Sequence, residues 1–225
     1  MSILKIRMIF RELILWPSPN EPINVQEVGN YIRRFGVYNA IRKAVHLILR
    51  TLGQVHFRKI KAILYFKSST LNLGRHVKIH GLANRIKMGL DNTIYDYCIF
   101  HFNSESRFET GDHVLFSYHV LVSCEYDIQI GNYVQIGEFT SIRDTTHDYA
   151  VLGNMMGSKD KSAAIRIGNN VWIGRGCLIC EGAIIEDGVV VAANSVVKGR
   201  LLKDTIYGGA PAKAIKSRIE GIDGY

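Results

Sequence analysis

Long apolar runs, proline and low-complexity segments are scarce in this sequence of 225 residues. No apolar run is long enough for a membrane-spanning helix. The apolar start, Met1 to Trp16, is interrupted by charged residues and lacks the small-residue cleavage site of a secretory signal. With four prolines, 47% apolar and 10% aromatic residues, the composition excludes a disordered chain. We expect one globular domain, or a repeat domain with a smaller appendage.

Acidic residues are scarce in the first part of the chain. Residues 1–67 hold 12 Lys/Arg against 3 Asp/Glu (+9), and the remainder holds 16 against 17 (−1). Apolar residues at helical spacing within Val25–Leu52 predict a helix. We therefore expect a helical, basic N-terminal region over 1–67. It lacks any nucleic-acid-binding motif, so we predict no nucleic-acid partner.

Two interpretations of this basic region stay open. Its apolar Ile3, Ile6, Ile9 and Leu13 suggest a helix face that rests on anionic lipid at the inner membrane surface. The alternative is that the same face packs on the protein itself or on its neighbours. Four cysteines in a chain without an export signal predict reduced thiols, no disulfide and a cytoplasmic location.

A period of six organises the rest of the chain. Aliphatic residues recur at Ile167, Ile173, Ile179, Ile185, Val191 and Val197, and mostly small residues follow four positions later at Val171, Cys177, Ala183, Val189 and Ser195. Sequences with this hexapeptide period build parallel β-helices. Each short strand points one large side chain inward and a small one into the corner, and the coils stack through strand hydrogen bonds at roughly 4.8 Å.

The register of six extends upstream, and it breaks twice downstream of Thr110. It is present at Thr110, Phe116, Val122, Ile130, Ile136 and Ile142, and more loosely at Leu73, Ile79, Ile94 and Phe100. From 122 to 130 is eight residues, which implies a two-residue insertion, and from 142 to 167 is 25. The second break contains the polar sequence RDTTHDYAVLGNMMGSKDKSAA. A polar excursion from a regular solenoid is where function usually lies.

The C-terminal coils carry three further motifs in a fixed order. These are V-W-I-G at 171–174, A-x-S-V-V at 193–197 and a G-x-P-A-K-like ending at 209–213, downstream of a loop with a histidine. Together they resemble hexapeptide-repeat acetyltransferases, which include maltose, galactoside and bacterial polysaccharide O-acetyltransferases. The resemblance implies a mainly β chain with a left-handed parallel β-helix over 68–218, a tail over 219–225, and a homotrimer that binds acetyl-CoA between adjacent solenoids.

The resemblance also implies site residues. It assigns the general base to His147 in T-T-H-D, 25 residues before Trp172. The coenzyme contacts that it implies fall on Trp172, Arg175, Ala193, Lys198, Lys213 and Lys216.

Moving an acetyl group from a thioester to an alcohol requires removal of the hydroxyl proton as the oxygen attacks. A neutral imidazole suits this task near neutral pH. Asp144, Asp148 or a backbone carbonyl would accept the other ring N–H of His147, and the sequence does not choose among them. The expected reaction is O-acetylation of a carbohydrate hydroxyl in bacterial surface polysaccharide biosynthesis. The runner-up is N-acetylation of a nucleotide-linked amino sugar.

Two alternative functions, a zinc enzyme and a non-catalytic scaffold, belong to other classes of protein. A zinc carbonic-anhydrase-like solenoid needs three histidines on one metal. His101 and His119 have the spacing for adjacent coils, but the register slips between them, so we predict no metal. Cys177 and Cys180 form C-x-x-C, yet Cys177 falls in a small inward slot and favours packing. A non-catalytic scaffold is the other reading, and the His147 loop argues against it.

Overall fold

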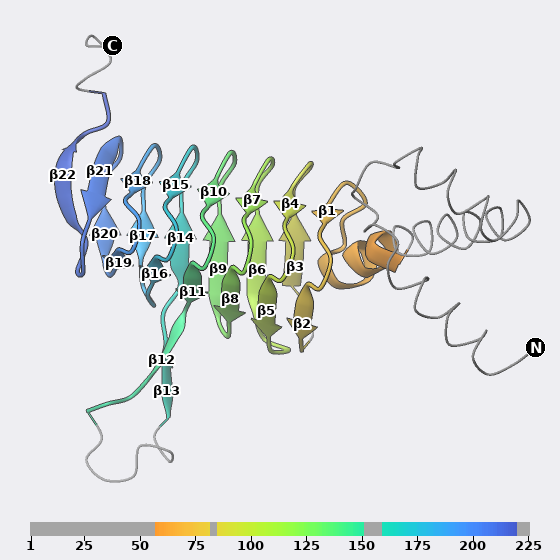
Figure 1. Cartoon of the computed structure of the whole chain (residues 1–225). Helices are drawn as coiled ribbons and strands as arrows, with labels where there is room; N and C mark the ends of the chain where they lie inside the picture. The colour runs from red at the N-terminus through yellow and green to blue at the C-terminus, as the bar shows by residue number, and fades with distance from the viewer. Residues whose placement is uncertain (1–56, 82–84, 151–158, 220–225) are drawn as a thin grey trace, which may run out of the picture. The chain divides into compact units, whose positions relative to one another are not determined.

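The computed structural model describes residues 57–81, 85–150 and 159–219 (Figure 1). The chain divides into two compact units, Met1–Phe57 and Arg58–Tyr225. The predicted helix within Val25–Leu52 and the apolar face near the N-terminus lie outside the described residues. In the part that is described, no helix is long and apolar enough to cross a membrane.

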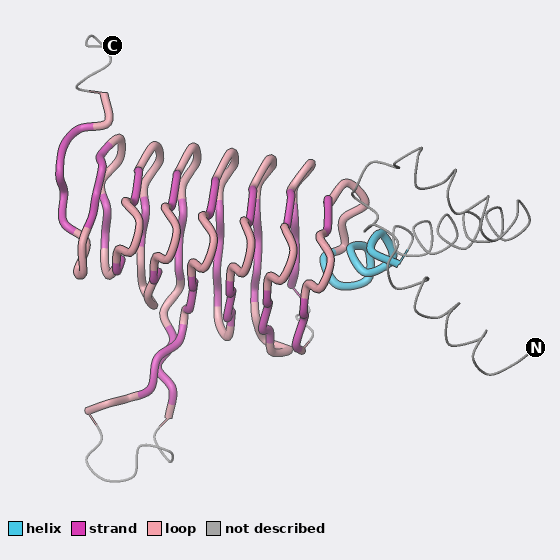
Figure 2. Tube along the Cα trace, in the orientation of Figure 1, coloured by secondary structure: helices cyan, strands magenta, loops and turns pink. Residues whose placement is uncertain are grey.

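The second unit is a solenoid of stacked coils with three long sheets (Figures 1 and 2). The first sheet has the order β1-β4-β7-β10-β15-β18-β21-β22. Its strands are Asn72–Leu73, Thr93–Ile94, Leu115–Phe116, Gln135–Ile136, Trp172–Ile173, Val190–Val191, Thr205–Gly208 and Lys213–Ser217. All its neighbours are parallel except β21 and β22, which are antiparallel.

The other two long sheets have six parallel strands each. The second sheet, in the order β19-β16-β11-β8-β5-β2, contains Val196–Val197, Leu178–Ile179, Ser141–Arg143, Leu121–Cys124, Ile99–Phe102 and Lys78–His80. The third sheet, in the order β20-β17-β14-β9-β6-β3, contains Arg200–Leu201, Ile184–Ile185, Ile165–Ile167, Asp127–Ile130, Arg107–Thr110 and Arg85–Met88. The predicted fold class, a parallel β-helix solenoid, is confirmed.

The hexapeptide register predicted the core. Every inward position named from residue 110 onward is buried, as are the small corner positions from Val171 to Ser195. Equivalent inward residues pair across adjacent coils, for example Ile136 with Ile173 and Ile173 with Val191. The result is a continuous aliphatic column, in which full burial of each large side chain contributes about 1.5–3 kcal/mol.

A helix over residues 57–66 precedes the first coil. Its Ala62 and Phe66 are buried, and the Phe66 ring meets Phe100 edge-on with centroids 5.2 Å apart. The open end of a solenoid would expose apolar side chains. The aromatic contact covers part of this end and extends the core beyond the first coil.

Several corners use residues other than glycine. His76, Tyr97, His119 and Phe139 occupy the same corner of successive coils with φ between 57° and 65°. Their rings stack with centroids 5.0, 5.1 and 4.9 Å apart. This left-handed conformation is unfavourable for bulky residues, and ring stacking offsets part of that cost. This row of corners is therefore formed without glycine.

The two register breaks have different structures. At the first break, Val122, Cys124, Ile128 and Ile130 are all buried, so the extra residues widen the corner between β8 and β9. At the second break the chain leaves the solenoid as a two-stranded hairpin, β12 (Thr145–His147) with β13 (Asp160–Ser162). Figure 2 shows this hairpin projecting away from the coils.

Candidate functional site

The hairpin places His147 opposite Asp160. The two residues are partners in the antiparallel register, and His147 Nδ1 lies 2.6 Å from Asp160 Oδ1. Their side chains are 74% and 52% exposed. An ionised carboxylate only accepts hydrogen bonds, so Nδ1 carries the hydrogen in this contact. The Nε2 atom has no partner among the described contacts.

The two carboxylates named from the sequence have other partners. Asp148 Oδ1 lies 2.7 Å from Lys161 Nζ, and this hydrogen bond lowers the pKa of Asp148. Asp144 is fully buried and accepts backbone N–H groups. Asp160 is therefore the residue that sequence reasoning missed. It lies in the polar excursion, thirteen residues after His147, and only the strand pairing brings the two together.

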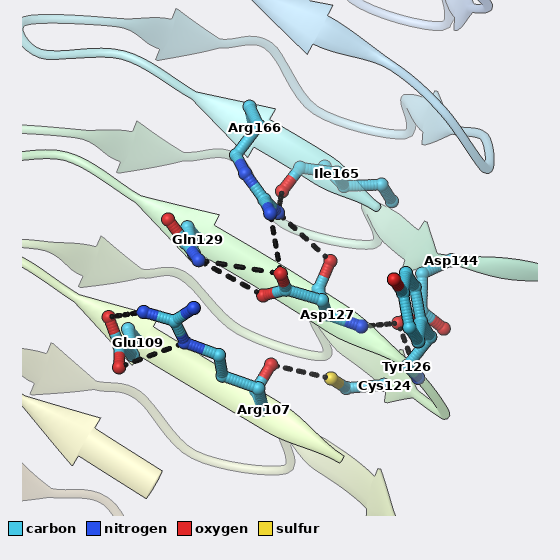
Figure 3. Close-up of polar contacts among 9 residues, drawn as sticks. All are labelled: Arg107, Glu109, Cys124, Tyr126, Asp127, Gln129, Asp144, Ile165 and Arg166. Atoms are coloured by element: carbon cyan, nitrogen blue, oxygen red, sulfur yellow. Dashed lines mark hydrogen bonds and ion pairs between the residues drawn. The ribbon is translucent and has the colours of Figure 1, made fainter. Parts of the chain in front are cut away.

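Figure 3 shows the base of the hairpin beside the widened corner. The Asp144 carboxylate accepts hydrogen bonds from the backbone N–H groups of Glu125, Tyr126 and Asp127. Asp127 in turn receives the guanidinium of Arg166. A network of hydrogen bonds and one ion pair thus connects the base of the hairpin to the neighbouring coil.

Three of the predicted coenzyme contacts lie on β15 of the first sheet or at the corners that follow β15 and β18. Trp172 on β15 is 55% exposed. Arg175 and Ala193 occupy equivalent corners of adjacent coils, since the N–H of Asn194 donates to the Arg175 carbonyl. A side chain on Gly174 would approach the Ala193 nitrogen to 2.6 Å. Glycine therefore permits close stacking of these corners, and Arg175 extends outward to Glu138 at 3.4 Å.

The predicted lysines lie on two different elements. Lys213 and Lys216 are exposed on β22, where they pair in register with Gly208 and Ile206 of β21. Lys198 is exposed after β19, at the other end of that strand from Ala193. The structure therefore does not bring Lys198 together with the corner that contains Arg175 and Ala193.

The tail after β22 is fixed by an arginine. Arg218 donates to the carbonyls of Asn170 and Gly188 at 2.9 and 2.8 Å. Its guanidinium is therefore engaged with the protein's own backbone, unlike the exposed lysines of β22.

A groove of about 390 Å³ lies elsewhere, on the outer face of the third sheet. Its lining includes Lys87, Glu109, Gln129, Arg166 and Asn169 but no histidine, cysteine or predicted site residue. The groove therefore lacks a residue suited to take a proton near neutral pH.

The structure also bears on the metal reading. His101 on β5 stacks on His80 of β2 at 4.6 Å, whereas His119 lies at a corner and stacks on Tyr97 and Phe139. Across the described ranges, no three His, Cys, Asp or Glu side chains are grouped so as to hold a metal ion. The four cysteines are free thiols.

Comparisons with known proteins agree with this architecture. Residues 164–199 match the family model described as bacterial transferase hexapeptide (six repeats). A putative lipopolysaccharide biosynthesis O-acetyl transferase of Escherichia coli K12, WbbJ, is 34% identical over 113 residues, which cover 47% of this chain and 58% of WbbJ. An E. coli dTDP-4-amino-4,6-dideoxy-D-glucose acyltransferase is 27% identical, over 65% of this chain and 82% of that protein.

A solved structure shares the fold. The Bacillus cereus N-acyltransferase AntD, in complex with dTDP and 3-hydroxybutyryl-CoA, superposes with a TM-score of 0.57 at 22% identity, over 66% of this chain and 80% of that one. The chain spans about half the length of curated relatives such as WbbJ and a probable acetyltransferase of Mycobacterium tuberculosis.

The fold and the site define a class: a parallel β-helix with a histidine–carboxylate pair on an inserted hairpin. Within this solenoid, residues 164–199 match the hexapeptide-repeat family model, and the chain is similar to acyltransferases of this architecture.

Proposed function

We propose that this chain is an acetyl-CoA-dependent O-acetyltransferase that modifies a carbohydrate hydroxyl in bacterial surface polysaccharide biosynthesis, with His147 as general base. The observation that carries the proposal is the contact of 2.6 Å between His147 Nδ1 and Asp160 Oδ1. It fixes the tautomer whose Nε2 accepts a proton. The similarity to WbbJ supports the reaction and the class of acceptor.

The chemistry follows from this tautomer. The acceptor oxygen attacks the thioester carbonyl carbon while Nε2 takes the hydroxyl proton, and the Asp160 carboxylate stabilises the imidazolium that forms. The C–S bond then breaks, and the proton passes from the imidazolium to the departing thiolate. The products are the acetyl ester and free coenzyme A.

The exposed basic and aromatic residues suit a coenzyme with phosphate groups. Lys213 and Lys216 on β22 present two exposed cations, which would attract the 3′-phosphate or the pyrophosphate. Trp172 offers an exposed aromatic surface beside Arg175 and Ala193. Lys198 would contact the coenzyme only from the other end of β19.

The outer faces of all three sheets expose apolar side chains, which supports a homotrimer. Trp172, Leu178 and Ile184, one on each sheet, are 55%, 36% and 41% exposed. Residues of this kind favour burial against another subunit. A mass of three chains by light scattering tests this, and a monomeric mass contradicts it.

A second candidate reaction is N-acetylation of a nucleotide-linked amino sugar. The acyltransferase of E. coli named for dTDP-4-amino-4,6-dideoxy-D-glucose matches over a larger share of its own length, 82%, than WbbJ does. Both reactions need the same base and donor, so the acceptor alone distinguishes them.

The test measures coenzyme A release from acetyl-CoA with isolated surface polysaccharide and, separately, with nucleotide-linked amino sugars. We expect release with polysaccharide and a loss of at least about 10²-fold in His147→Ala. His113→Asn is the matched control, because His113 sits at a corner with φ 56° that asparagine tolerates. Release only with amino sugars would establish the second candidate, and wild-type turnover in His147→Ala would overturn the assignment of the base.

We also propose that the basic region 1–67 contacts the inner membrane surface, at the site where lipid-linked glycans are assembled. The support is its charge of +9 in the sequence and its apolar N-terminal residues. Deletion of residues 1–16 should abolish binding to anionic vesicles and preserve activity on soluble acceptors. Full-length protein that does not sediment with anionic vesicles at low salt would leave the alternative, that this face packs within the protein.

A further inference from the structure

The widened corner of one coil lies directly beneath the hairpin that carries His147. Phe102 pairs in register with Cys124, and Arg143 pairs with Ser123. The next residue, Asp144, therefore occupies in its coil the inward position that Phe102 and Cys124 occupy in theirs. Both of those are apolar and buried, whereas Asp144 places a carboxylate in a fully buried position.

The buried Asp144 carboxylate holds the first leg of the hairpin, which is the strand β12; the second leg is β13. Asp144 Oδ1 accepts the N–H of Glu125 at 2.8 Å. Its Oδ2 accepts the N–H groups of Tyr126 and Asp127, each at 2.9 Å. These three donors lie at the widened corner between β8 and β9 of the preceding coil, and β12 begins directly after Asp144, at Thr145. A buried charge of this kind is stable only when such donors surround it.

The same turn holds the second leg. After β13 the chain returns to the solenoid at β14, where the Arg166 guanidinium pairs with the Asp127 carboxylate. Arg166 Nη1 also donates to the carbonyls of Asp127 and Ile165 at 3.3 and 2.9 Å. The legs are joined to each other where the Ala163 N–H donates to the Asp144 carbonyl at 2.9 Å.

We propose that the turn 125–127, Asp144 and Arg166 form a clamp that positions the hairpin, so that Asp127, Asp144 and Arg166 are positioning residues for His147. The proposal rests on the function proposed above for His147. The widened corner at the first register break thus holds the hairpin at the second. It supplies three N–H groups to Asp144 and the Asp127 carboxylate to Arg166. Figure 3 shows Asp144 beside this corner and the pair of Asp127 with Arg166.

The physical need for a clamp follows from the size of the hairpin. Three residue pairs join β12 to β13, and an isolated two-stranded hairpin is marginally stable in water. Fixing both legs to a rigid coil limits their freedom to tilt. A displacement of the catalytic histidine by about 1 Å costs up to about 10²-fold in rate. The attachment of the hairpin to the coil should therefore affect turnover.

The solvent side of the clamp offers a test with a matched control. Arg166 and Asp127 have side chains 37% and 14% exposed. On the neighbouring strand β6, Arg107 and Glu109 form a similar pair, 42% and 32% exposed, which touches neither leg of the hairpin. Arg166→Gln and Asp127→Asn break the first pair, and Glu109→Gln breaks the second.

We expect Arg166→Gln and Asp127→Asn to lower kcat about 10-fold, with the KM for acetyl-CoA unchanged, because the base is displaced while the coenzyme surface is intact. Arg166→Lys keeps the charge and should recover much of the loss. Hydrogen exchange measured by mass spectrometry should accelerate in 145–147 and 160–162 and stay unchanged in the coils. Glu109→Gln should match the wild type in both measurements.

Wild-type kcat and hairpin exchange in Arg166→Gln would overturn the clamp, as would an equal loss in Glu109→Gln. Exchange at the hairpin does not depend on catalysis. If His147→Ala proves fully active, the proposed base fails, yet faster exchange in Arg166→Gln would still show that the turn holds the hairpin.

Discussion

His147 Nδ1 lies 2.6 Å from Asp160 Oδ1 across the antiparallel pair of β12 and β13. The two side chains face each other because their residues are register partners at the last described pair of the hairpin. The contact orients the imidazole, although both residues stand well outside the hydrophobic column. In the function proposed above, Nε2 is the atom that takes the proton of the acceptor hydroxyl.

Asp160→Asn should lower kcat by about 10-fold to 10²-fold and leave the thermal midpoint unchanged. The amide is neutral and stabilises the imidazolium less, and it also permits the other tautomer of His147. Steady-state kinetics with saturating acetyl-CoA measure the effect. Asp148→Asn, which breaks only the pair with Lys161, is the control, and an equal loss in both variants would argue against an orienting role for Asp160.

Lys213→Glu combined with Lys216→Glu should raise the KM for acetyl-CoA, because two favourable phosphate contacts become repulsive. The effect should shrink with a coenzyme that lacks the 3′-phosphate. If both coenzymes lose affinity equally, these lysines do not recognise that phosphate.

Ile185→Asp should unfold or dissociate the solenoid. The side chain is 1% exposed in the inward column, where an unpaired charge is strongly unfavourable. Circular dichroism during heating measures the transition, and Gln135→Asp is the control, since Gln135 is an exposed polar residue at an outward strand position. A native-like transition in Ile185→Asp would contradict the register.

Asp144→Ala should destabilise the fold by at least about 2 kcal/mol, because three backbone N–H groups lose their buried acceptor. Urea denaturation followed by fluorescence measures the free energy of unfolding. Asp148→Ala removes the ion pair with Lys161 and one hydrogen bond from the Ala150 N–H, both on the hairpin outside the core, and should leave the midpoint unchanged. Equal stabilities of the two variants would contradict the structural role of the buried carboxylate.

The four thiols should react slowly with iodoacetamide in the native protein at pH 8. Burial disfavours the thiolate, which raises the pKa of Cys98 to about 11 and raises the pKa values of Cys177 and Cys180. The reactive fraction therefore grows only as the pH rises toward those values. Mass spectrometry should find Cys180 modified first, since the other three are buried, and all four should react in urea. Rapid native modification of Cys98 would contradict its burial.

The clearest success of sequence reasoning is the core, and its clearest gap is Asp160. Ile167, Ile173 and Ile179 were predicted to point inward because a period of six has one physical solution, a coil that buries one side chain per short strand. His147 followed from a family motif. Asp160 followed from neither, because the pairing of two strands across a thirteen-residue separation leaves no period in the sequence.

Sequence by itself determined the solenoid, its inward residues and the positions of both register breaks, because each depends on local spacing along the chain. The tertiary structure alone decided what those breaks do. Only stacking of successive coils places Asp144 over the N–H groups of residues 125–127 and Arg166 beside Asp127. Only the pairing of β12 with β13 places Asp160 opposite His147. Contacts between coils and across a hairpin depend on which residues are paired between strands, and spacing along the sequence does not determine this pairing.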